Sequence, residues 1–216
     1  MRASPSTVVS VALSVLLACS PARMDPATGL PVGQMGPEAA IARARADSVR
    51  LPYTAADIHF MSGMISHHAQ AIKMAKWATS HGANPSLIRL SERIVTGQTD
   101  EIALMQSWLR DRNQTVPEPD PAGMKMSMGG AEHVMLMPGM LSPEQMTQLD
   151  AARGNEFDRL FLTFMIQHHR GAITMVRELF SAHGAGQDEI VFKFANEVEV
   201  DQETEIARMQ QMLIEL

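Results

Sequence analysis

The 216-residue sequence has a single cysteine and few aromatic side chains: seven phenylalanines, two tryptophans and one tyrosine. One cysteine excludes an intramolecular disulfide framework and a cysteine-based zinc site. The scarcity of aromatic rings disfavours base stacking, and a net charge of −6 disfavours binding to a phosphate backbone, so we expect no nucleic-acid partner. Methionine is abundant instead, at 18 residues. Its thioether is both a core-filling group and a ligand for soft metals.

The N-terminal residues have the features of an export signal. The apolar run over residues 7–17 is too short to span a bilayer and has the length of a signal-peptide core. It ends in Leu-Leu-Ala before Cys19, which resembles a bacterial lipoprotein cleavage box. We predict a signal peptide over 1–18, lipidation of Cys19 and a flexible tether over 19–36. The alternative is an ordinary secretion signal with an incidental cysteine. The lipid interpretation places the protein outside the cytoplasm on a membrane, facing the periplasm in a Gram-negative source.

Two sequence patterns occur twice. Residues 60–74 and 161–175 share Met, Ile, His-His, Ala-Ile and Met at one offset. Residues 98–106 and 202–210 share the pattern Gln-x-x-Glu-Ile-Ala-x-Met-Gln. Because the order is the same in both halves, the sequence predicts an internal duplication.

Each half is predicted to be a helical hairpin. In the first half, Thr54 and Asp57 form a capping-box pattern, and Asn84-Pro85 marks the start of a second helix that runs to about Arg112. In the second half, Ser142-Pro143 opens a short helix, a long helix reaches Phe180, and the last helix begins near Gln187. No alternating stretch is long enough to predict a strand.

The predicted architecture is therefore all-α: a four-helix bundle made of two repeated hairpins. Residues 37–112 hold the first hairpin with a short accessory helix near 37–49. Residues 113–141 form a Met-rich linker, and 142–216 hold the second hairpin, so that 37–216 is one bundle domain.

Helical periodicity places ionisable groups on otherwise apolar faces. His68 and His169 lie at the centres of two such faces, whereas His67 and His168 fall on a neighbouring stripe, as rim ligands or solvated groups. A buried carboxylate needs a partner or a cation. The polar groups expected to point inward are Asp57, His68, Gln98, Glu101, Asp158, His169, Gln202 and Glu205. A His–Glu hydrogen bond within each hairpin would also satisfy these groups without a metal, and the core methionines would then be packing residues.

The linker carries methionines that a core does not require. Met124, Met126 and Met128 alternate along it, and His133 follows. Thioethers select Cu(I) or Ag(I), and imidazole accepts copper in either oxidation state. We predict a soft-metal site here; a hydrophobic flap over the bundle, or methionines that act as oxidation sinks, are the alternatives.

The doubled pattern resembles the domain-of-unknown-function family 305 over about residues 50–216. The resemblance implies a ferritin-like fold and extracytoplasmic binding of copper or silver by methionine and histidine. Leu162 stands where the first half has Met61, so the second half has one thioether fewer. Ferritin-type di-iron sites need Glu-x-x-His, and here Ile65 and Ile166 occupy the glutamate positions, which disfavours a di-iron oxidase.

The sequence thus predicts a copper-binding lipoprotein rather than an enzyme, since no nucleophile–base arrangement is evident. The candidate metal ligands are Met61, Met64, His67, His68, Met74, Glu101, Met105, Met165, His168, His169, Met175, Glu205, Met209, Met124, Met126, Met128 and His133. Two alternatives stay open. One is a dinuclear-metal oxidase that uses His68, His169 and the two glutamates, with iron less expected than copper. The other is a structural module in which a polar core only fixes the helix register.

Overall fold

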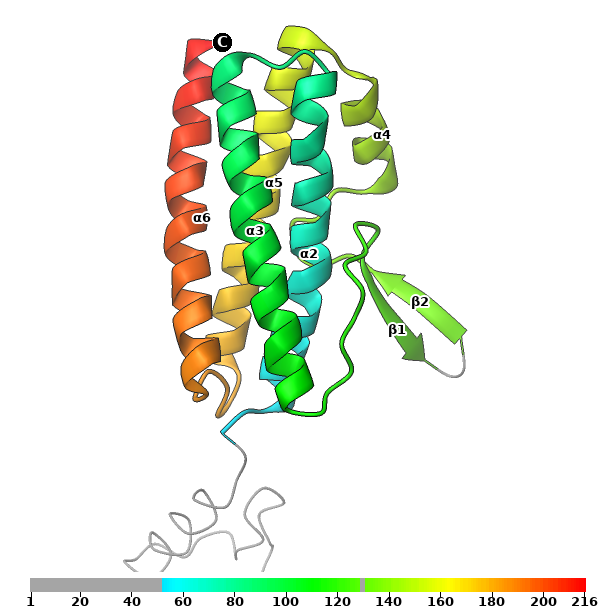
Figure 1. The fold of residues 1–216 in the computed structure, drawn as a ribbon, viewed down its shortest axis with the longest axis vertical. Coiled ribbons are helices and arrows are strands. Elements are labelled where there is room, and N and C mark those ends of the chain that lie inside the picture. The colour runs from blue at the N-terminus through cyan, green and yellow to red at the C-terminus, as the bar shows by residue number, and fades with distance from the viewer. Residues whose placement is uncertain (1–51, 129–130) are drawn as a thin grey trace, which may run out of the picture. The chain divides into compact units, whose positions relative to one another are not determined.

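The computed structural model describes residues 52–128 and 131–216 as a four-helix bundle with a short fifth helix beside it (Figure 1). The helices are α2 (Ala55–Ser80), α3 (Pro85–Asp111), α4 (Pro143–Ala151), α5 (Gly154–Ser181) and α6 (Glu189–Glu215). The all-α prediction is confirmed. The predicted signal peptide, Cys19, the tether and the accessory helix lie outside the described residues. Within the described part, no helix is both long and apolar enough to span a bilayer.

The helices begin where their capping residues indicate. Thr54 and Asp57 form the predicted capping box of α2: the Thr54 amide donates to the Asp57 carboxylate at 2.6 Å. The Asn84 side chain accepts hydrogen bonds from the first amides of α3, at 2.9 and 3.0 Å. Asp188 caps α6 in the same way, one residue after the predicted start. Local side-chain chemistry therefore sets the start of α2, α3 and α6, whereas α5 begins after Arg153, whose side chain makes no capping hydrogen bond within the described residues.

The apolar core consists of two clusters, one toward each end of the bundle. On α2, the first cluster takes residues 60–65 and the second takes buried residues of 71–78. On α5, the second cluster takes buried residues of 157–166 and the first takes those of 172–179. Both His-His pairs fall in the gap between the clusters. A polar layer therefore divides the core halfway along the helices.

The linker between the two helical hairpins contains two strands that the sequence did not lead us to predict. Strands β1 (Met124–Met128) and β2 (Ala131–Met135) pair in antiparallel register. The prediction was wrong because these strands contain methionine in place of the β-branched residues that mark most strands. The usable signal was Gly129-Gly130 between two short runs, a two-residue hairpin pattern. We call β1–β2 the ribbon.

Candidate metal centre

Two histidines meet at the middle of the bundle. His67 on α2 and His168 on α5 are both completely buried, and their ring centroids lie 3.8 Å apart. The prediction that they lie on the rim or in solvent is wrong. A helical wheel allows one buried face per helix, but α2 packs against α3, α5 and the linker together, so it is buried almost all round.

Each of the other two histidines contacts a glutamate on the neighbouring helix of its own hairpin. Nε2 of His169 donates to Oε2 of Glu205 at 2.7 Å. Nε2 of His68 lies 2.8 Å from Oε2 of Glu101, but without the alignment of a hydrogen bond. Both imidazoles are fully buried, whereas the Glu101 and Glu205 side chains are 23% and 16% exposed. The carboxylates therefore connect the buried rings to the surface. We call His67, His68, His168 and His169 the histidine layer.

Among the residues that the structure describes, most ring nitrogens of the histidine layer have no hydrogen-bond partner. The unpaired atoms are Nδ1 of His67, both nitrogens of His68, both nitrogens of His168, and Nδ1 of His169. Buried polar atoms are nearly always paired, because each one left unpaired costs about 1–3 kcal/mol. A concentration of such atoms at one level of a bundle needs a functional explanation, and a bound ion is one that uses their lone pairs.

Burial keeps the two central histidines neutral. It is the largest cause that lowers the pKa of His67 well below its ordinary value, and positive charge on His68 or His169 would lower that pKa further. Burial likewise lowers the pKa of His168, and His67 acts on it in the same direction. Neutral imidazole is the form that binds metals, so burial favours ligation.

A segment of the linker covers one side of the central histidines. Residues 137–141 form this segment, which we call the strap. Nε2 of His67 donates to the Pro138 carbonyl at 3.1 Å. Gln70 holds the end of the strap, because its side chain donates to the Leu141 carbonyl at 3.1 Å and accepts from the Leu141 amide at 2.6 Å. The strap is therefore tied by side chains of α2 to the layer that it covers.

Two helical glycines make room for the strap. A Cβ on Gly171 of α5 would lie 1.9 Å from the Pro138 oxygen, and one on Gly63 of α2 would lie 2.6 Å from the Met137 sulfur. Met137 and Met140 are buried, so the strap adds two thioethers that were absent from the predicted ligand set. Sequence reasoning could have found the contact, because an isolated glycine inside a helical pattern weakens the helix and so indicates a packing role for that position.

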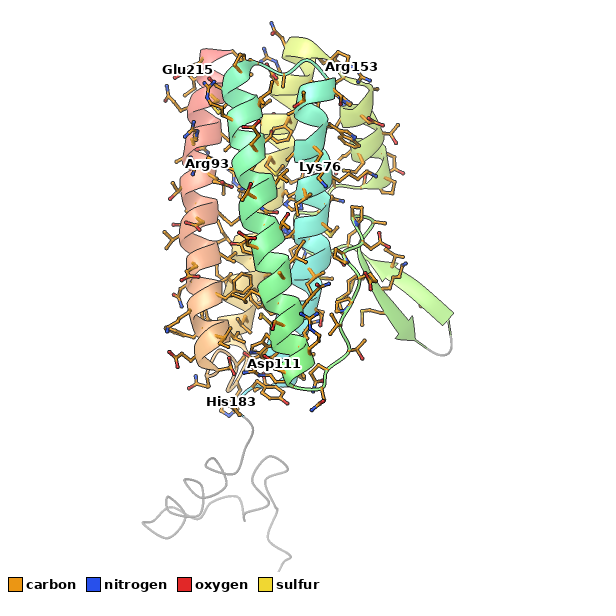
Figure 2. All side chains as sticks on the ribbon, in the orientation of Figure 1. Lys76, Arg93, Asp111, Arg153, His183 and Glu215 are labelled. Atoms are coloured by element: carbon orange, nitrogen blue, oxygen red, sulfur yellow. The ribbon has the colours of Figure 1, made fainter. Side chains whose placement is uncertain are left out.

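An acidic pocket lies between α3 and α6, outside the histidine layer. Its volume is about 190 Å³, and Glu101, Glu205 and Asp201 line it together with Arg93, which Figure 2 labels. Burial raises the pKa of Asp201, and the neighbouring Glu101 and Glu205 raise it further. Gln98 and Gln202 also line this pocket, each with a buried, unpaired Oε1. The glutamates that contact the buried histidines thus share one negatively charged recess.

Asp57 and Asp158, predicted to join the inward polar set, act elsewhere. Asp57 accepts from the Gly186 amide of the α5–α6 loop at 2.7 Å. Asp158 accepts from the amide and side chain of Asn84 in the α2–α3 loop, at 3.2 and 2.8 Å. Each aspartate at the start of one hairpin therefore fixes the loop of the other, at opposite ends of the bundle.

Residues 57–213 match the family described as "Domain of unknown function (DUF305)". The chain belongs to the DUF305 family. A DUF305 fragment from Deinococcus radiodurans has the same fold with a TM-score of 0.63 and 27% identity, over 77% of this chain and 100% of that one. A DUF305 protein from Streptomyces coelicolor, described as secreted, matches with a TM-score of 0.61 and 27% sequence identity. The match covers 74% of this chain and 93% of that one.

The fold is also that of CopM, a protein whose structures include Cu(I)-bound, Cu(II)-bound, silver-bound and apo forms. The Cu(II)-bound form gives a TM-score of 0.57 and 27% identity over 74% of this chain and 96% of CopM. Among curated sequences, protein L153 of Acanthamoeba polyphaga mimivirus is 38% identical over 56 residues, which span 26% of this chain and 37% of that protein.

The DUF305 bundle brings some of the predicted ligands together and separates others. The four histidines and two glutamates share one layer. The buried methionines lie on either side of it: Met61, Met64, Met105 and Met175 in the first apolar cluster, and Met74, Met165 and Met209 in the second. Met124, Met126 and His133 lie on the ribbon instead, with His133 exposed.

Within residues 52–128 and 131–216, no three His, Cys, Asp or Glu side chains form a group that could hold a metal ion. Nitrogen and oxygen atoms alone are therefore not preorganised as a cage. An ion in this layer would need a thioether, or a movement of the rings, to complete its coordination.

Proposed function

We propose that this chain is an extracytoplasmic copper-binding protein that buffers or transfers Cu(I), with Ag(I) as an equivalent soft ion, through imidazole and thioether ligands. The observation that carries the proposal is the set of unpaired ring nitrogens in the histidine layer. An ion would use the lone pairs that the protein leaves without partners.

The donor set fits a soft ion that binds few ligands. Nδ1 of His67 is free to ligate because its Nε2 already donates to the Pro138 carbonyl, and this second bond fixes the ring orientation. His168 offers two unpaired nitrogens. The Met137 sulfur packs on Gly63, one helical turn before His67. A mixed nitrogen and sulfur environment selects Cu(I) or Ag(I) over Mg²⁺ and Ca²⁺.

The carboxylates have a supporting role in this proposal. Glu205 holds the Nε2 hydrogen of His169, so Nδ1 of that ring is the atom left for a metal. The acidic recess outside the layer would attract a cation toward Glu101 and Glu205. The copper-bound and silver-bound forms of CopM support the choice of metal.

The proposed location follows from the N-terminal sequence. A lipid on Cys19 would hold the bundle at a membrane outside the cytoplasm, and the secreted relative from Streptomyces coelicolor supports export. Replacing Cys19→Ala should release the protein from the membrane fraction of the producing cell. Unchanged membrane attachment would contradict the lipid anchor and leave the copper proposal intact.

The copper proposal is tested by competition with a Cu(I) chelator of known affinity. Substitution of both His67 and His168 by Gln should lower the Cu(I) affinity at least about tenfold. The matched control is His81→Gln, because His81 is also buried but both its ring nitrogens have partners in Ser80 and Asp150. Equal Cu(I) affinity for the wild type and the double variant, with a lowered melting temperature, would support the structural module instead.

One observation favours a second candidate, a dinuclear-metal oxidase: Glu101 and Glu205 line the same pocket while each contacts its own histidine. This candidate predicts oxygen consumption after anaerobic loading with Fe(II) or Cu(I), and its loss in a Glu101→Gln and Glu205→Gln double variant. Absence of oxygen uptake by the loaded wild type would eliminate it.

A further inference from the structure

We propose that one face of the ribbon is a second soft-metal site, solvent-accessible and separate from the histidine layer. This inference rests on the proposed function for its choice of metal, and on the ribbon's own register for its geometry. In that register Met124 pairs with Met135, and Met126 pairs with His133. The two strands thus bring together side chains that lie up to eleven positions apart in the sequence.

Strand geometry places these four side chains on the same face. Residues two apart along a strand point the same way, and directly opposed residues of an antiparallel pair share a face. Lys125 and Val134, which also pair with each other, therefore point to the other face. The first face carries three thioethers and an imidazole, and the second carries an ammonium and a valine.

The spacing of the four residues suits a single ion. Opposed Cβ atoms in an antiparallel pair lie about 4.5–5.5 Å apart. Residues two apart on one strand are separated by about 6.4–6.8 Å. The four Cβ atoms therefore form a rectangle on the face of the ribbon. The centre of this rectangle lies about 4 Å from each Cβ, and an ion would bind above that centre. A methionine or histidine side chain can span that distance and contact the ion.

Packing does not explain the whole face. Met124 is partly buried and packs against the first apolar cluster, so it anchors the ribbon. Met135, however, is 37% exposed, and His133 is exposed as well. On such a strand a β-branched residue would have better propensity than methionine. The Lys125 ammonium forms an ion pair with Asp120 at 3.1 Å.

The ligand chemistry selects a soft monovalent ion. Thioethers bind Cu(I) and Ag(I) and have little affinity for hard cations, and one imidazole adds a donor that both ions accept. The face has no carboxylate among Met124, Met126, His133 and Met135, so it carries no fixed negative charge for a hard divalent ion. This site differs from the histidine layer because an ion reaches it without any movement of the bundle helices.

The test uses Ag(I), which is diamagnetic, and the full chain labelled with ¹³C at the methionine methyls. In the wild type, the methyl resonances of Met124, Met126 and Met135 should shift together during titration. A triple variant, Met124→Leu with Met126→Leu and Met135→Leu, keeps the apolar volume and should bind about one Ag(I) fewer per chain. The control is Met146→Leu on α4, outside both proposed sites, which should leave the stoichiometry unchanged.

The outcomes separate the two proposals. If the wild type binds neither Cu(I) nor Ag(I), both fail. If the triple variant binds as many Ag(I) ions as the wild type with the same affinity, the ribbon site is wrong and the histidine layer remains. If the ribbon resonances shift and the triple variant loses the ion, the site stands. The single variant Met135→Leu repeats the test without touching Met124 and its packing; it should weaken Ag(I) binding, and unchanged affinity would count against the site.

Discussion

The two helical hairpins bring the same His-His pair to the centre of the bundle, but they hold the strap differently. Only the first half bonds it through a histidine, whereas the second half bonds it through Gln167, whose side chain donates to the Gly139 carbonyl at 3.3 Å. In the first half His67 donates to the Pro138 carbonyl, whereas in the second half both nitrogens of His168 are unpaired. At the matching position three residues further on, the first half has Gln70, which binds the strap, and the second has Gly171, which makes room for it. The linker thus makes two similar sequences inequivalent.

The difference extends to the outer histidines. His169 and Glu205 form an aligned hydrogen bond, while His68 and Glu101 are close but not aligned. Each neutral imidazole offers one lone pair to an ion. Hydrogen bonds at Nε2 fix that lone pair on Nδ1 in His67 and His169, whereas either nitrogen can carry it in His68 and His168. The repeated motif therefore provides the ligand types in both halves. The non-repeated linker occupies Nε2 of His67, and the alignment of the repeated glutamates sets the difference between the outer rings.

The largest effect should come from removing the space for the strap in the second half. Gly171→Ala places a Cβ 1.9 Å from the Pro138 oxygen and 2.5 Å from the Gly139 Cα, and backbone atoms cannot rotate away. We expect the free energy of unfolding in urea to fall by about 3 kcal/mol or more. Gly63→Ala is the comparison in the first half. Its clash involves the flexible end of Met137, so the loss should be about 1 kcal/mol. Equal losses would contradict this account of the strap.

Acid should destabilise the metal-free protein through the two central histidines. Their pKa values are lowered in the fold, so between the unfolded value near 6.5 and the folded values the unfolded chain binds protons that the native state does not. Stability therefore falls as the pH falls below about 6.5, by up to about 2.7 kcal/mol per pH unit for two histidines.

The measurement is the free energy of unfolding from pH 7.5 to 5, in the presence of a metal chelator. The His67→Gln and His168→Gln double variant should lose this part of the pH dependence, and each single variant should lose about half of it. If the free energy of unfolding depends on pH with the same slope in the double variant and in the wild type, protonation of His67 and His168 is not the cause of the acid destabilisation.

The bundle was predictable because its information is local. Thr54, Asp57, Asn84 and Ser142 mark helix starts by capping chemistry, and a cap needs only a few neighbouring residues. The ribbon was missed because alternating methionines resemble a flexible metal-binding chain as much as a strand. Its register depends on cross-strand pairing, which propensity alone does not reveal.

The candidate site was predictable only in part. Helical periodicity placed His68 and His169 in the interior and paired each with a glutamate in its own hairpin. It missed the burial of His67 and His168, because that burial comes from the contact of α2 with α5 and from the strap. Met137 and Met140 were visible as linker methionines. Their position beside the layer depends on Gly63 and Gly171, which lie far away in sequence.

Removing the Gln70 hydrogen bonds that attach the strap to α2 should lower the free energy of unfolding by less than Gly171→Ala does. Gln70→Ala removes hydrogen bonds to Leu141 at both its amide and its carbonyl, and one to the Pro121 carbonyl at 3.1 Å. Buried amide bonds contribute about 1 kcal/mol each, so we expect a loss of about 2–3 kcal/mol in the free energy of unfolding. Gln106→Ala is the control, because it removes a single long bond of 3.4 Å to Pro117 and should cost less than about 1 kcal/mol. A loss at Gln70 no larger than that at Gln106 would mean that the Gln70 hydrogen bonds do not hold the strap in place.

The smallest effect should distinguish the two His–Glu contacts. Glu205→Gln removes the charge from an aligned hydrogen bond to a buried ring, whereas Glu101→Gln changes a contact that lacks this alignment. Because direction contributes strongly to hydrogen-bond strength, Glu205→Gln should destabilise the metal-free protein by about 1 kcal/mol more than Glu101→Gln. Urea unfolding of the two variants at pH 7.5 measures this difference, and ¹⁵N shifts of the His68 and His169 rings report the tautomers. Equal losses of stability with identical shifts would show that the halves are equivalent at this level. The inequivalence would then be confined to the side of the layer that the strap covers.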